Sequence, residues 1–459
     1  MNKTIFKEKK YIHIDKLCNL SEVIPKIKDK NFILKHGFYP FLGNKIIFKK
    51  YSVEINEETQ NHFKRKERPI KYASHIDSLI YQWYSYLLNK YYNNYALSRG
   101  FNTSSIAYRT CFPGKSSVDF AKEAIDFIKS TGSCYILVSD FSNFFDKIDH
   151  KILKENICRI MNISKLPADW FKIYKSMTKY CCLNKVDIED YLIKNGFETK
   201  KTLNAKKKYK EKKDLNDNKC YFENIPWNDA KKDLKELIKN GINKDEYGIP
   251  QGASLSGIFA NCFMIDFDEE LYRYSMEHNG LYMRYSDDII VIIPTGVGVT
   301  EKDIWNKICQ CKDTLNNLEI NKEKTSIYLY DDKKIMSLHE NEKGFKKSPN
   351  RISYLGFTFD GENVKLRDKT IIKFYYKIYH KIDSMTSREK IRLKYNKKRK
   401  SKIDKHWILK KIYPSSHRNR FANYLAKAKK VFSNEKYIQD FDKNLKNKIF
   451  NRFNKKKVK

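Results

Sequence analysis

The chain has 459 residues and a formal net charge of +37, from 92 Lys and Arg residues against 55 Asp and Glu residues. With 41% hydrophobic and 14% aromatic residues it is apolar enough to fold into two or three subdomains, which excludes a disordered chain. The positive charge favours a polyanionic partner, and nucleic acid fits better than a membrane. Part of the excess fits an AT-rich coding bias, because Lys, Asn, Ile and Tyr are all abundant.

Targeting signals and metal-binding cysteines are not expected. Met1–Leu20 is polar and charged, and no apolar run is long enough to span a bilayer. We therefore expect no signal peptide, no membrane contact and a cytoplasmic location. The ten cysteines form no CxxC pair of the kind that tetrahedral zinc sites use, so we expect reduced thiols.

The first part of the chain predicts an extension, two helices and a buried strand. Residues 1–60 mix charged and apolar residues without a strong period, and we expect an N-terminal extension there. Ile76–Tyr95 has apolar and aromatic residues at helical spacing and predicts a buried helix, and Ser117–Ser130 predicts a second one. Cys134–Val138 predicts a buried strand, and Asp149 is the expected N-cap of the next helix.

Two basic residues flank a turn in the loop Phe101–Ser117. Arg109 and Lys115 lie on either side of Pro113-Gly114, where an Arg fork and a Lys point charge are suited to contact a triphosphate. The loop is not a Walker A motif, because Arg109 stands where the first glycine is required. A solvated basic loop is the alternative interpretation.

The main candidate for chemistry is a pair of adjacent carboxylates. Two apolar strands, Leu281–Tyr285 and Ile289–Ile293, flank a tight connection that carries Asp287 and Asp288. Each negative charge makes the other harder to ionise, and a bound divalent cation removes that penalty. Asp140, at the end of another apolar strand, is a rigidly held candidate metal ligand. A solvated Asp-Asp turn is the alternative.

Residues 198–246 differ in composition from their surroundings. Thr199–Lys219 is a Lys-rich, low-complexity run that predicts an exposed insertion, and Trp227–Asn240 predicts a helix. Tyr247–Ser254 contains two glycines and a proline and predicts a rigid turn whose backbone can approach a ligand closely. We expect Ser254 to cap a long amphipathic helix that ends near Met276.

Beyond the paired carboxylates the chain becomes progressively more basic. Thr300–Leu318 predicts a helix, Ser326–Tyr330 a strand, and Tyr354–Phe359 a short hairpin. From about Asp368 onward the sequence is basic, helical and rich in aromatic residues, and Lys397–Lys402 is its densest positive run.

Taken in order, these motifs resemble the motif series of reverse transcriptases over roughly residues 64–360. The sequence is similar to prokaryotic members, either group II intron-like enzymes or the retron and abortive-infection (unknown-group) defence enzymes. The matching segments are Arg68-Pro-Ile70, Ala107-Tyr-Arg109 with Gly114-Lys-Ser116, Asp140 with Phe144-Phe-Asp146, Pro250-Gln-Gly252, Tyr285-x-Asp-Asp288, Lys324-Thr325 and Leu355-Gly-Phe357.

The resemblance implies an α+β, right-hand polymerase fold with fingers, a ferredoxin-like antiparallel palm and a helical thumb. Its expected domains after the extension are fingers at residues 61–130, a palm at 131–366 with the Lys-rich insertion at about 198–246, and a basic thumb at 367–459.

The resemblance also implies two-metal nucleotidyl transfer. Asp140 and Asp287 would be the bridging ligands, Asp288 would support them, and the Phe141 carbonyl would join the set. Two ions about 4 Å apart would activate the 3′-hydroxyl and stabilise the leaving pyrophosphate. Oxygen ligands and a phosphate substrate select Mg²⁺, with Mn²⁺ as a substitute.

Nucleotide-binding residues are implied in the same way. Phe145 matches the steric gate that favours dNTPs, and Gln251 and Gly252 would lie along the templating base pair. Lys324 would lie near the pyrophosphate as a proton donor. Structural roles are the alternatives for Arg109, Lys115 and Lys324. The remaining implied nucleotide-binding residues are Arg68 at the basic entry and Arg109 and Lys115 near the triphosphate.

The expected function is RNA-directed DNA synthesis from dNTPs on an RNA template, with a dedicated structured non-coding RNA and anti-phage defence as the favoured setting. No Cys/His endonuclease tail, RNase H-like acidic set or extended maturase segment follows residue 360, which makes a self-mobilising intron enzyme the weaker reading. The alternatives are a retron or group II intron-like enzyme, a template-independent DNA polymerase, and a decayed polymerase that only binds RNA. The three carboxylates argue against the last.

Overall fold

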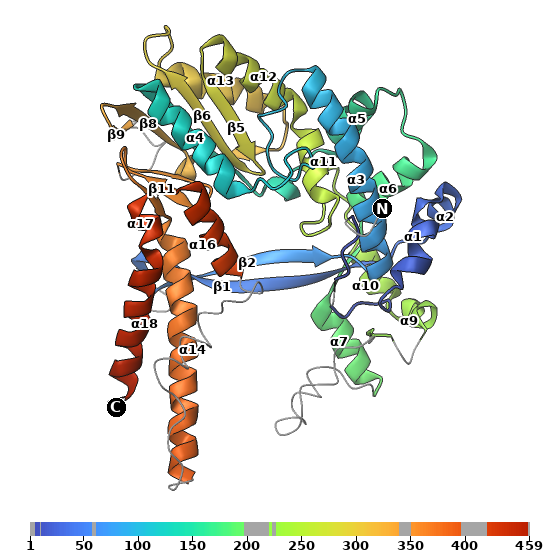
Figure 1. The fold of residues 1–459 in the computed structure, drawn as a ribbon. Coiled ribbons are helices and arrows are strands. Elements are labelled where there is room, and N and C mark those ends of the chain that lie inside the picture. Colours follow the sequence, from blue (N-terminus) through green and yellow to red (C-terminus); the bar gives the residue numbers. More distant parts are fainter. Residues whose placement is uncertain are drawn as a thin grey trace.

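The computed structural model describes residues 5–9, 11–56, 61–196, 220–222, 226–338, 350–395 and 420–457. The Lys-rich runs Thr199–Lys219 and Lys397–Lys402 lie outside these residues. Figure 1 shows a body of sheets and helices, a long hairpin below it, and a helical arm that carries the C-terminus. Within the described part of the chain, no helix is long and apolar enough to cross a membrane.

A mainly antiparallel sheet forms the centre of the body. Its strand order is β5-β6-β3-β8-β9, and the short strand β7 pairs with the far end of β3. The predicted strands are confirmed, although β3 extends past the expected end at Val138 and so includes Asp140. The strands are β3 (Cys134–Ser142), β5 (Leu281–Tyr285), β6 (Asp288–Pro294), β7 (Glu319–Ile320), β8 (Ser326–Asp331) and β9 (Lys334–Leu338).

Helices cover both faces of this sheet (Figure 1). Most follow the sequence prediction, and Asp149 caps α5 as expected, its side chain accepting from the Ile152 amide. The helices of the body are α3 (His75–Ser98), α4 (Ser117–Thr131), α5 (His150–Met161), α6 (Ala168–Thr178), α11 (Ser256–Phe263), α12 (Ile265–Glu277) and α13 (Glu301–Asp313).

Successive side chains of β6 enter two different hydrophobic cores. Ile289, Val291 and Ile293 pack in the core that includes α3, α5, α11, α12 and α13. Ile290 and Ile292 pack in the core on the other face, which includes α4. Because side chains alternate along a strand, a continuous apolar run is the pattern expected of a strand buried on both faces.

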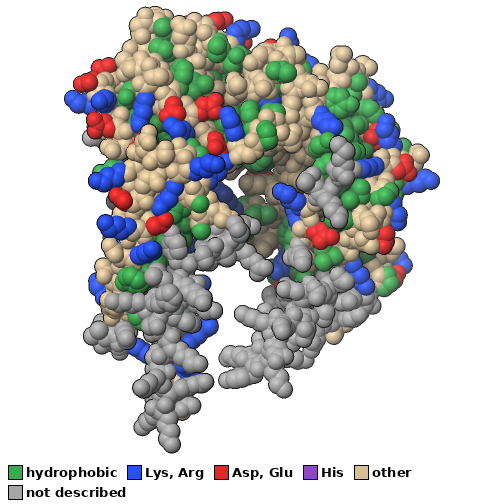
Figure 2. Space-filling view, viewed as in Figure 1, with side chains coloured by type: hydrophobic (Ala, Val, Ile, Leu, Met, Phe, Trp, Pro, Cys, Tyr) green, Lys and Arg blue, Asp and Glu red, His purple; other side chains and the backbone are tan. Residues whose placement is uncertain are grey.

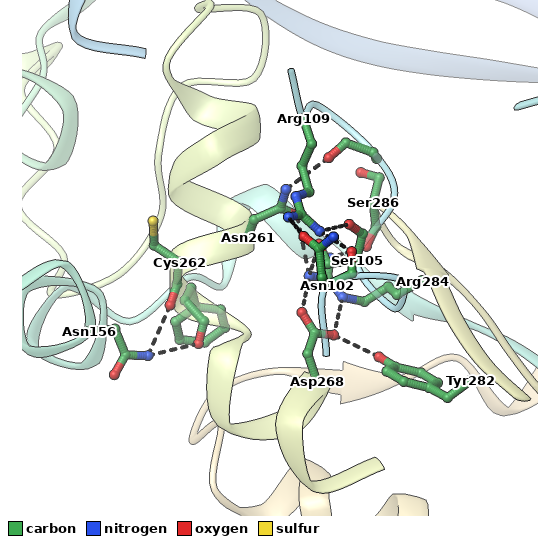
Figure 3. A network of polar contacts seen from close by, with 12 residues as sticks. Asn102, Ser105, Arg109, Asn156, Asn261, Cys262, Asp268, Tyr282, Arg284 and Ser286 are labelled. Carbon is green, nitrogen blue, oxygen red and sulfur yellow. Dashed lines mark hydrogen bonds and ion pairs between the residues drawn. The ribbon is translucent and has the colours of Figure 1, made fainter. Parts of the chain in front are cut away.

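The long helix predicted from Ser254 is wrong in two respects. Ser254 is not its cap, because α11 begins two residues later, at Ser256. The Ser256 hydroxyl donates to the Pro250 carbonyl (2.6 Å). The helix also breaks at Met264, between α11 and α12. Asn156 of α5 donates to the carbonyls of Cys262 and Phe263 (3.0 and 3.2 Å), so a distant residue satisfies carbonyls at this helix end (Figure 3).

The predicted boundary at residue 60 falls inside one structural unit. After α1 (Leu20–Lys28) and α2 (Lys30–Lys35), strands β1 (Phe41–Asn56) and β2 (Asn61–Tyr72) form a long antiparallel hairpin. Residues 41–56 therefore belong with the predicted fingers and not with a separate extension. The sequence did not indicate this hairpin because residues 41–56 mix charged and apolar residues without the clear alternation that marks a half-buried strand.

A small satellite core lies beside the base of this hairpin. β1 pairs in parallel with β4 (Cys182–Asn184), and Leu42 and Leu183 pack with side chains of α7 (Lys185–Lys194). The helix predicted at Trp227–Asn240 is confirmed but interrupted at Leu234, which gives α9 (Trp227–Asp233) and α10 (Lys235–Asn240). The buried Leu234 belongs to the same core.

The C-terminal helices join the body through a three-stranded sheet and a shared core. Tyr375, Ile382, Leu425 and Phe432 pack in the core that also contains Ile290 and Ile292 of the central sheet. Two ion pairs fix this unit to α4, Lys427 with Asp119 at 2.6 Å and Lys129 with Glu435 at 3.1 Å. The elements are β10 (Ile352–Tyr354), β11 (Phe357–Phe359), β12 (Val364–Leu366), α14 (Asp368–Tyr395), α16 (Arg420–Val431), α17 (Lys436–Gln439) and α18 (Phe441–Lys457).

Candidate active site

Three carboxylates predicted from the sequence meet at one end of the central sheet. Asp140 of β3 and Asp288 of β6 are direct partners in the antiparallel register. The Phe141 amide donates to the Asp287 carbonyl (3.3 Å), which joins the end of β3 to the hairpin tip. The fold therefore brings together residues that are far apart in the sequence, as the metal-site hypothesis requires.

The tip that carries Asp287 is a strained two-residue turn. Tyr285 pairs with Asp288, so only Ser286 and Asp287 connect β5 to β6. Ser286 has a φ of 63°, a backbone conformation that favours glycine in such turns. A residue with a side chain keeps this conformation only where surrounding contacts hold it there.

Arg284 provides the main contact that holds the turn (Figure 3). Its side chain is fully buried, and its Nη1 donates to the Ser286 carbonyl (2.9 Å). Nε and Nη2 donate to both carboxylate oxygens of Asp268 in α12 (2.7 and 2.5 Å). Burial alone would lower the pKa of Arg284, but the charge and hydrogen bonds of Asp268 raise it above its ordinary value, so the guanidinium stays charged.

The same buried network reaches two more segments of the chain. Nη2 of Arg284 also contacts Ser105 and Asn261, each at 3.2 Å. Tyr282 donates to Asp268 (2.7 Å), which leaves this carboxylate well supplied with donors. Charged groups inside a protein are tolerated when they are paired and hydrogen-bonded in this way.

Tyr108 contacts the turn from the other side. Its hydroxyl donates to Ser286 Oγ (3.0 Å). Its ring lies against Gly257, where a Cβ would come within 2.5 Å of the ring, so only glycine permits this approach. The Asn261 amide donates to the carbonyl of Ala107 (2.8 Å) and fixes the neighbouring backbone. The loop before α4 is thus locked onto the turn that carries the carboxylates.

The carboxylates create a strongly negative local field. Burial, and then the charges of Asp287 and Asp140, raise the pKa of Asp288 to about 6, while Arg367 and Lys324 act in the opposite direction. Lys324, in the turn between β7 and β8, donates directly to the Asp140 carboxylate. The site therefore favours a cation, and the side chain of Lys324 supplies one.

The donor chemistry of this site fits a hard divalent cation. Three carboxylates are ligands that Mg²⁺ and Mn²⁺ prefer. Among the described residues, however, no group of three His, Cys, Asp or Glu side chains is arranged to chelate a metal ion as it stands. Instead, Lys324 forms an ion pair with Asp140.

Phe144 and Phe145 follow β3 and have different environments. Asn143, with a φ of 50°, ends the strand and starts a short 3-10 turn, η1 (Phe144–Asp146). Phe144 is buried and stacks on Phe141 with ring centroids 5.8 Å apart. Phe145 is only half-buried at the edge of the same core. The structure thus separates the pair into one core aromatic ring and one that keeps an accessible face.

The turn that contains Gln251 lies beside Phe145. The Ile249 amide donates to the Phe145 carbonyl (2.9 Å), and the Lys71 amide of β2 donates to the Gln251 carbonyl (2.9 Å). Gly252 has a φ of 125°, and a Cβ there would lie 2.6 Å from the Lys71 carbonyl. Phe145, Gln251 and Gly252, predicted separately to contact the nucleotide, are therefore brought into one region.

Besides Lys324, three basic residues were predicted to contact the nucleotide, and each has a different environment. Arg109 is only 9% exposed, and its guanidinium donates to Asn93, to Asn102 and to the Ser105 carbonyl at 2.5–3.0 Å. This placement favours the structural role over a triphosphate contact. Lys115 is exposed and lies 3.4 Å from Glu123 beside the C-terminal helices, and Arg68 is exposed on β2.

Sequence reasoning missed the residues that hold the site together. Arg284, Asp268 and Tyr108 were not singled out, and neither was Arg367, whose charge acts on Asp288. One signal was present: Arg284 is a charged residue inside the otherwise apolar run of β5, where only a buried partner makes it tolerable. Its partner could not be identified without the fold.

Comparisons with known proteins agree with this geometry. Residues 162–359 match the family model described as reverse transcriptase (RNA-dependent DNA polymerase), a range that contains Gln251, Asp287, Asp288 and Lys324. This match covers less than half of the chain, and the α+β fold predicted from the sequence is confirmed. A search of curated protein sequences finds no match.

Among solved structures the chain is similar to yeast telomerases at low identity. A C-terminally truncated apo telomerase from Candida tropicalis is 16% identical with a TM-score of 0.40, and the alignment covers 70% of this chain and 57% of the telomerase chain. The apo telomerase of the same species is 15% identical with a TM-score of 0.41, and the alignment covers 72% of this chain and 48% of the telomerase chain. A Candida albicans telomerase in complex with a TWJ fragment of telomeric RNA is 13% identical with a TM-score of 0.37, with coverage of 92% and 64%. The chain spans less than two thirds of each telomerase chain.

Loss of the Arg284 charge should destabilise the fold and the hairpin turn together. We expect Arg284→Gln to lower the free energy of unfolding by about 3–5 kcal/mol, because it leaves Asp268 as a buried, unpaired charge. Urea unfolding of the purified variant measures this. The matched control is Arg273→Gln, which removes an arginine that pairs with Glu270 on exposed surface of the same α12 and should change stability by less than about 1 kcal/mol. Equal losses in both variants would contradict the assigned role of Arg284.

Proposed function

We propose that the protein is an RNA-directed DNA polymerase that adds dNTPs to a 3′-hydroxyl end by two-metal nucleotidyl transfer. The observation that carries this proposal is the meeting of Asp140, Asp287 and Asp288 at the end of two paired strands. The reverse transcriptase domain at residues 162–359 supports the reaction class. Its range starts after Asp140, so the assignment of that residue rests on the strand register.

In this mechanism the carboxylates of Asp140, Asp287 and Asp288 would hold two divalent ions, with Mg²⁺ as the expected metal. When bound, the ions supply activation of the 3′-hydroxyl and stabilisation of the pyrophosphate charge. Arg284 and Tyr108 keep the turn of Ser286 and Asp287 in its strained conformation, so the ligand positions are set before substrate binds.

Phe145 is the proposed determinant of sugar choice. Carboxylates that bind metal contact only phosphates and the attacking hydroxyl, so they do not distinguish dNTPs from rNTPs. The Phe145 carbonyl accepts from the Ile249 amide in the turn that leads to Gln251, and its half-buried side chain supports a role beside a bound nucleotide. A ring at this place excludes a 2′-hydroxyl by steric clash and by desolvation.

A basic groove on the C-terminal helices supports a nucleic-acid partner. Four lysines occur at every fourth position of α14, so they lie along one side of the helix. Together with Phe374 and Phe421 they line a groove of about 680 Å³, and the centroids of these two rings lie 3.8 Å apart. The groove also includes Gly356 and Arg367, and the charge of Arg367 acts on Asp288. In Figure 2, Lys and Arg side chains gather on both sides of the central hollow. The lysines are Lys369, Lys373, Lys377 and Lys381.

The proposal also includes the type of enzyme, its template, its biological role and its location, which rest only on the resemblance of the motifs. They are a retron-like or abortive-infection type of enzyme, a dedicated structured RNA as template, a role in anti-phage defence and a cytoplasmic location. The competing readings are an intron-type enzyme, a template-independent polymerase, and a decayed polymerase that only binds RNA. Primer extension with defined templates separates the last two from the proposed activity.

The first prediction concerns the metal ligands. We expect Asp140→Asn and Asp287→Asn each to reduce Mg²⁺-dependent dNTP incorporation by at least about 10³-fold, because each removes a charged ligand while keeping the side-chain shape. Incorporation on an RNA template with a DNA primer measures the loss, and circular dichroism checks the fold. Asp146→Asn, in the exposed turn after Phe145, is the control. Near-normal synthesis by both ligand variants would rule out this site.

A second prediction concerns the sugar. We expect Phe145→Val to keep DNA synthesis and to admit rNTPs on the order of 10²-fold better relative to dNTPs. Phe144→Val is the matched control: it removes a buried ring, so it should lower stability by a few kcal/mol without changing sugar choice. Competition between dNTPs and rNTPs on one primer-template measures both. Unchanged selectivity in Phe145→Val would remove the structural reason for naming DNA as the product.

A third prediction concerns the basic groove. Replacing Lys373 and Lys377 together by glutamine should weaken RNA binding and lower the slope of log affinity against log salt by about 1 to 2, because each lysine neutralises roughly one phosphate. Fluorescence anisotropy at several salt concentrations measures the slope. The control replaces Lys235 and Lys239, which have the same spacing on the exposed helix α10. A loss of slope that is the same in both double variants would refute a specific role for α14.

A further inference from the structure

Lys324 is attached to the carboxylate site through its backbone and occupies it through its side chain. The turn η2 (Lys322–Lys324) follows β7, which pairs with the end of β3. The Asn321 amide donates to the Asp140 carbonyl (2.8 Å), and the buried Thr325 hydroxyl bonds that of Ser139 (2.8 Å). Backbone on both sides of Lys324 is thus fixed to β3.

The side chain of Lys324 is free to take another position without disturbing this anchor. It is 51% exposed, whereas the Asp140 side chain that it contacts is only 13% exposed. A lysine has four rotatable bonds, so its ammonium group can move several ångströms while the backbone stays in place. The ion pair is therefore a contact that can open.

Lys324 contacts the carboxylate oxygen of Asp140 that is not buried. Oδ1 of Asp140 is buried, and Lys324 donates to Oδ2. A cation that approaches from solvent therefore meets the ammonium group before it meets the carboxylate. Because an ammonium group and a divalent ion at the same carboxylate oxygen repel each other, a divalent ion bound at Oδ2 would weaken the contact with Lys324.

From these contacts we propose that Lys324 is an internal counter-ion that fills the metal position at Asp140 in the metal-free protein and is displaced when a divalent cation binds. The inference rests on the proposed metal site. The neighbouring charges support it, since Asp140, Asp287 and Asp288 need a cation to offset their repulsion. Once displaced, the ammonium stays on the anchored turn beside the site, where the phosphates of a nucleotide would meet it.

Binding of Mn²⁺ to the full-length protein without nucleotide or nucleic acid tests this exchange. Electron paramagnetic resonance measures free Mn²⁺ in titrations of the wild type and of two variants, Lys324→Gln and Lys322→Gln. Lys322 is an exposed lysine in the same turn, and its replacement removes the same charge without touching Asp140. We expect Lys324→Gln to bind Mn²⁺ on the order of tenfold more tightly, and Lys322→Gln to bind less than about twofold more tightly.

Thermal unfolding supplies a second readout. In the absence of metal, Lys324→Gln should have a lower melting temperature than Lys322→Gln, because the ammonium group that offsets its carboxylates is gone. Saturating Mg²⁺ should remove this difference in melting temperature. Equal Mn²⁺ affinities and equal melting temperatures in the two lysine variants would overturn the exchange. Mn²⁺ binding by Asp287→Asn is the test of the metal site itself. If this variant binds Mn²⁺ as the wild type does, or if the wild type binds none, the metal site of the proposed function is wrong, and this inference fails with it.

Discussion

The buried ion pair of Arg284 with Asp268 is the interaction on which the geometry of the carboxylate site depends. It connects β5 to α12 and extends one hydrogen bond to the Ser286 carbonyl at the strained turn. A lysine would offer a single point charge there, whereas the planar fork of arginine bonds both oxygens of Asp268 and still reaches the turn. One side chain therefore fixes a helix, a strand and the residue before the paired carboxylates.

Charge balance is the second constraint on the site. Three carboxylates gather near the end of β3 and the start of β6, and the surrounding protein offsets them with Lys324 and Arg367. Arg367 also begins the basic groove of α14, and the helices that carry this groove share a core with the central sheet. The negative site and the positive groove are therefore held at fixed positions relative to each other.

Much of this arrangement follows from local features of the sequence. The strand after Asp287 is a continuous β-branched run from Ile289 to Ile293, and the cap at Asp149 follows from a short-range preference. The order of the motifs was enough to predict the resemblance to reverse transcriptases, which the family match at residues 162–359 supports, because each motif occupies a stretch whose chemistry can be recognised without knowing its neighbours. The roles of Lys324, Phe145 and Gln251 as nucleotide contacts stay predictions.

By itself, the sequence determined most helices and strands of the body and indicated the three carboxylates; only the tertiary structure decided which charged residues are buried and where long segments pair. Arg109 and Arg284 are both basic residues beside apolar segments, yet Arg109 became structural and Arg284 became the support of the turn. The break at Met264 depends on Asn156, more than a hundred positions away, and the boundary near residue 60 on the pairing of β1 with β2. These outcomes depend on partners that are distant in the chain, and the free energy of burying a charge or ending a helix is set by those partners and not by local composition.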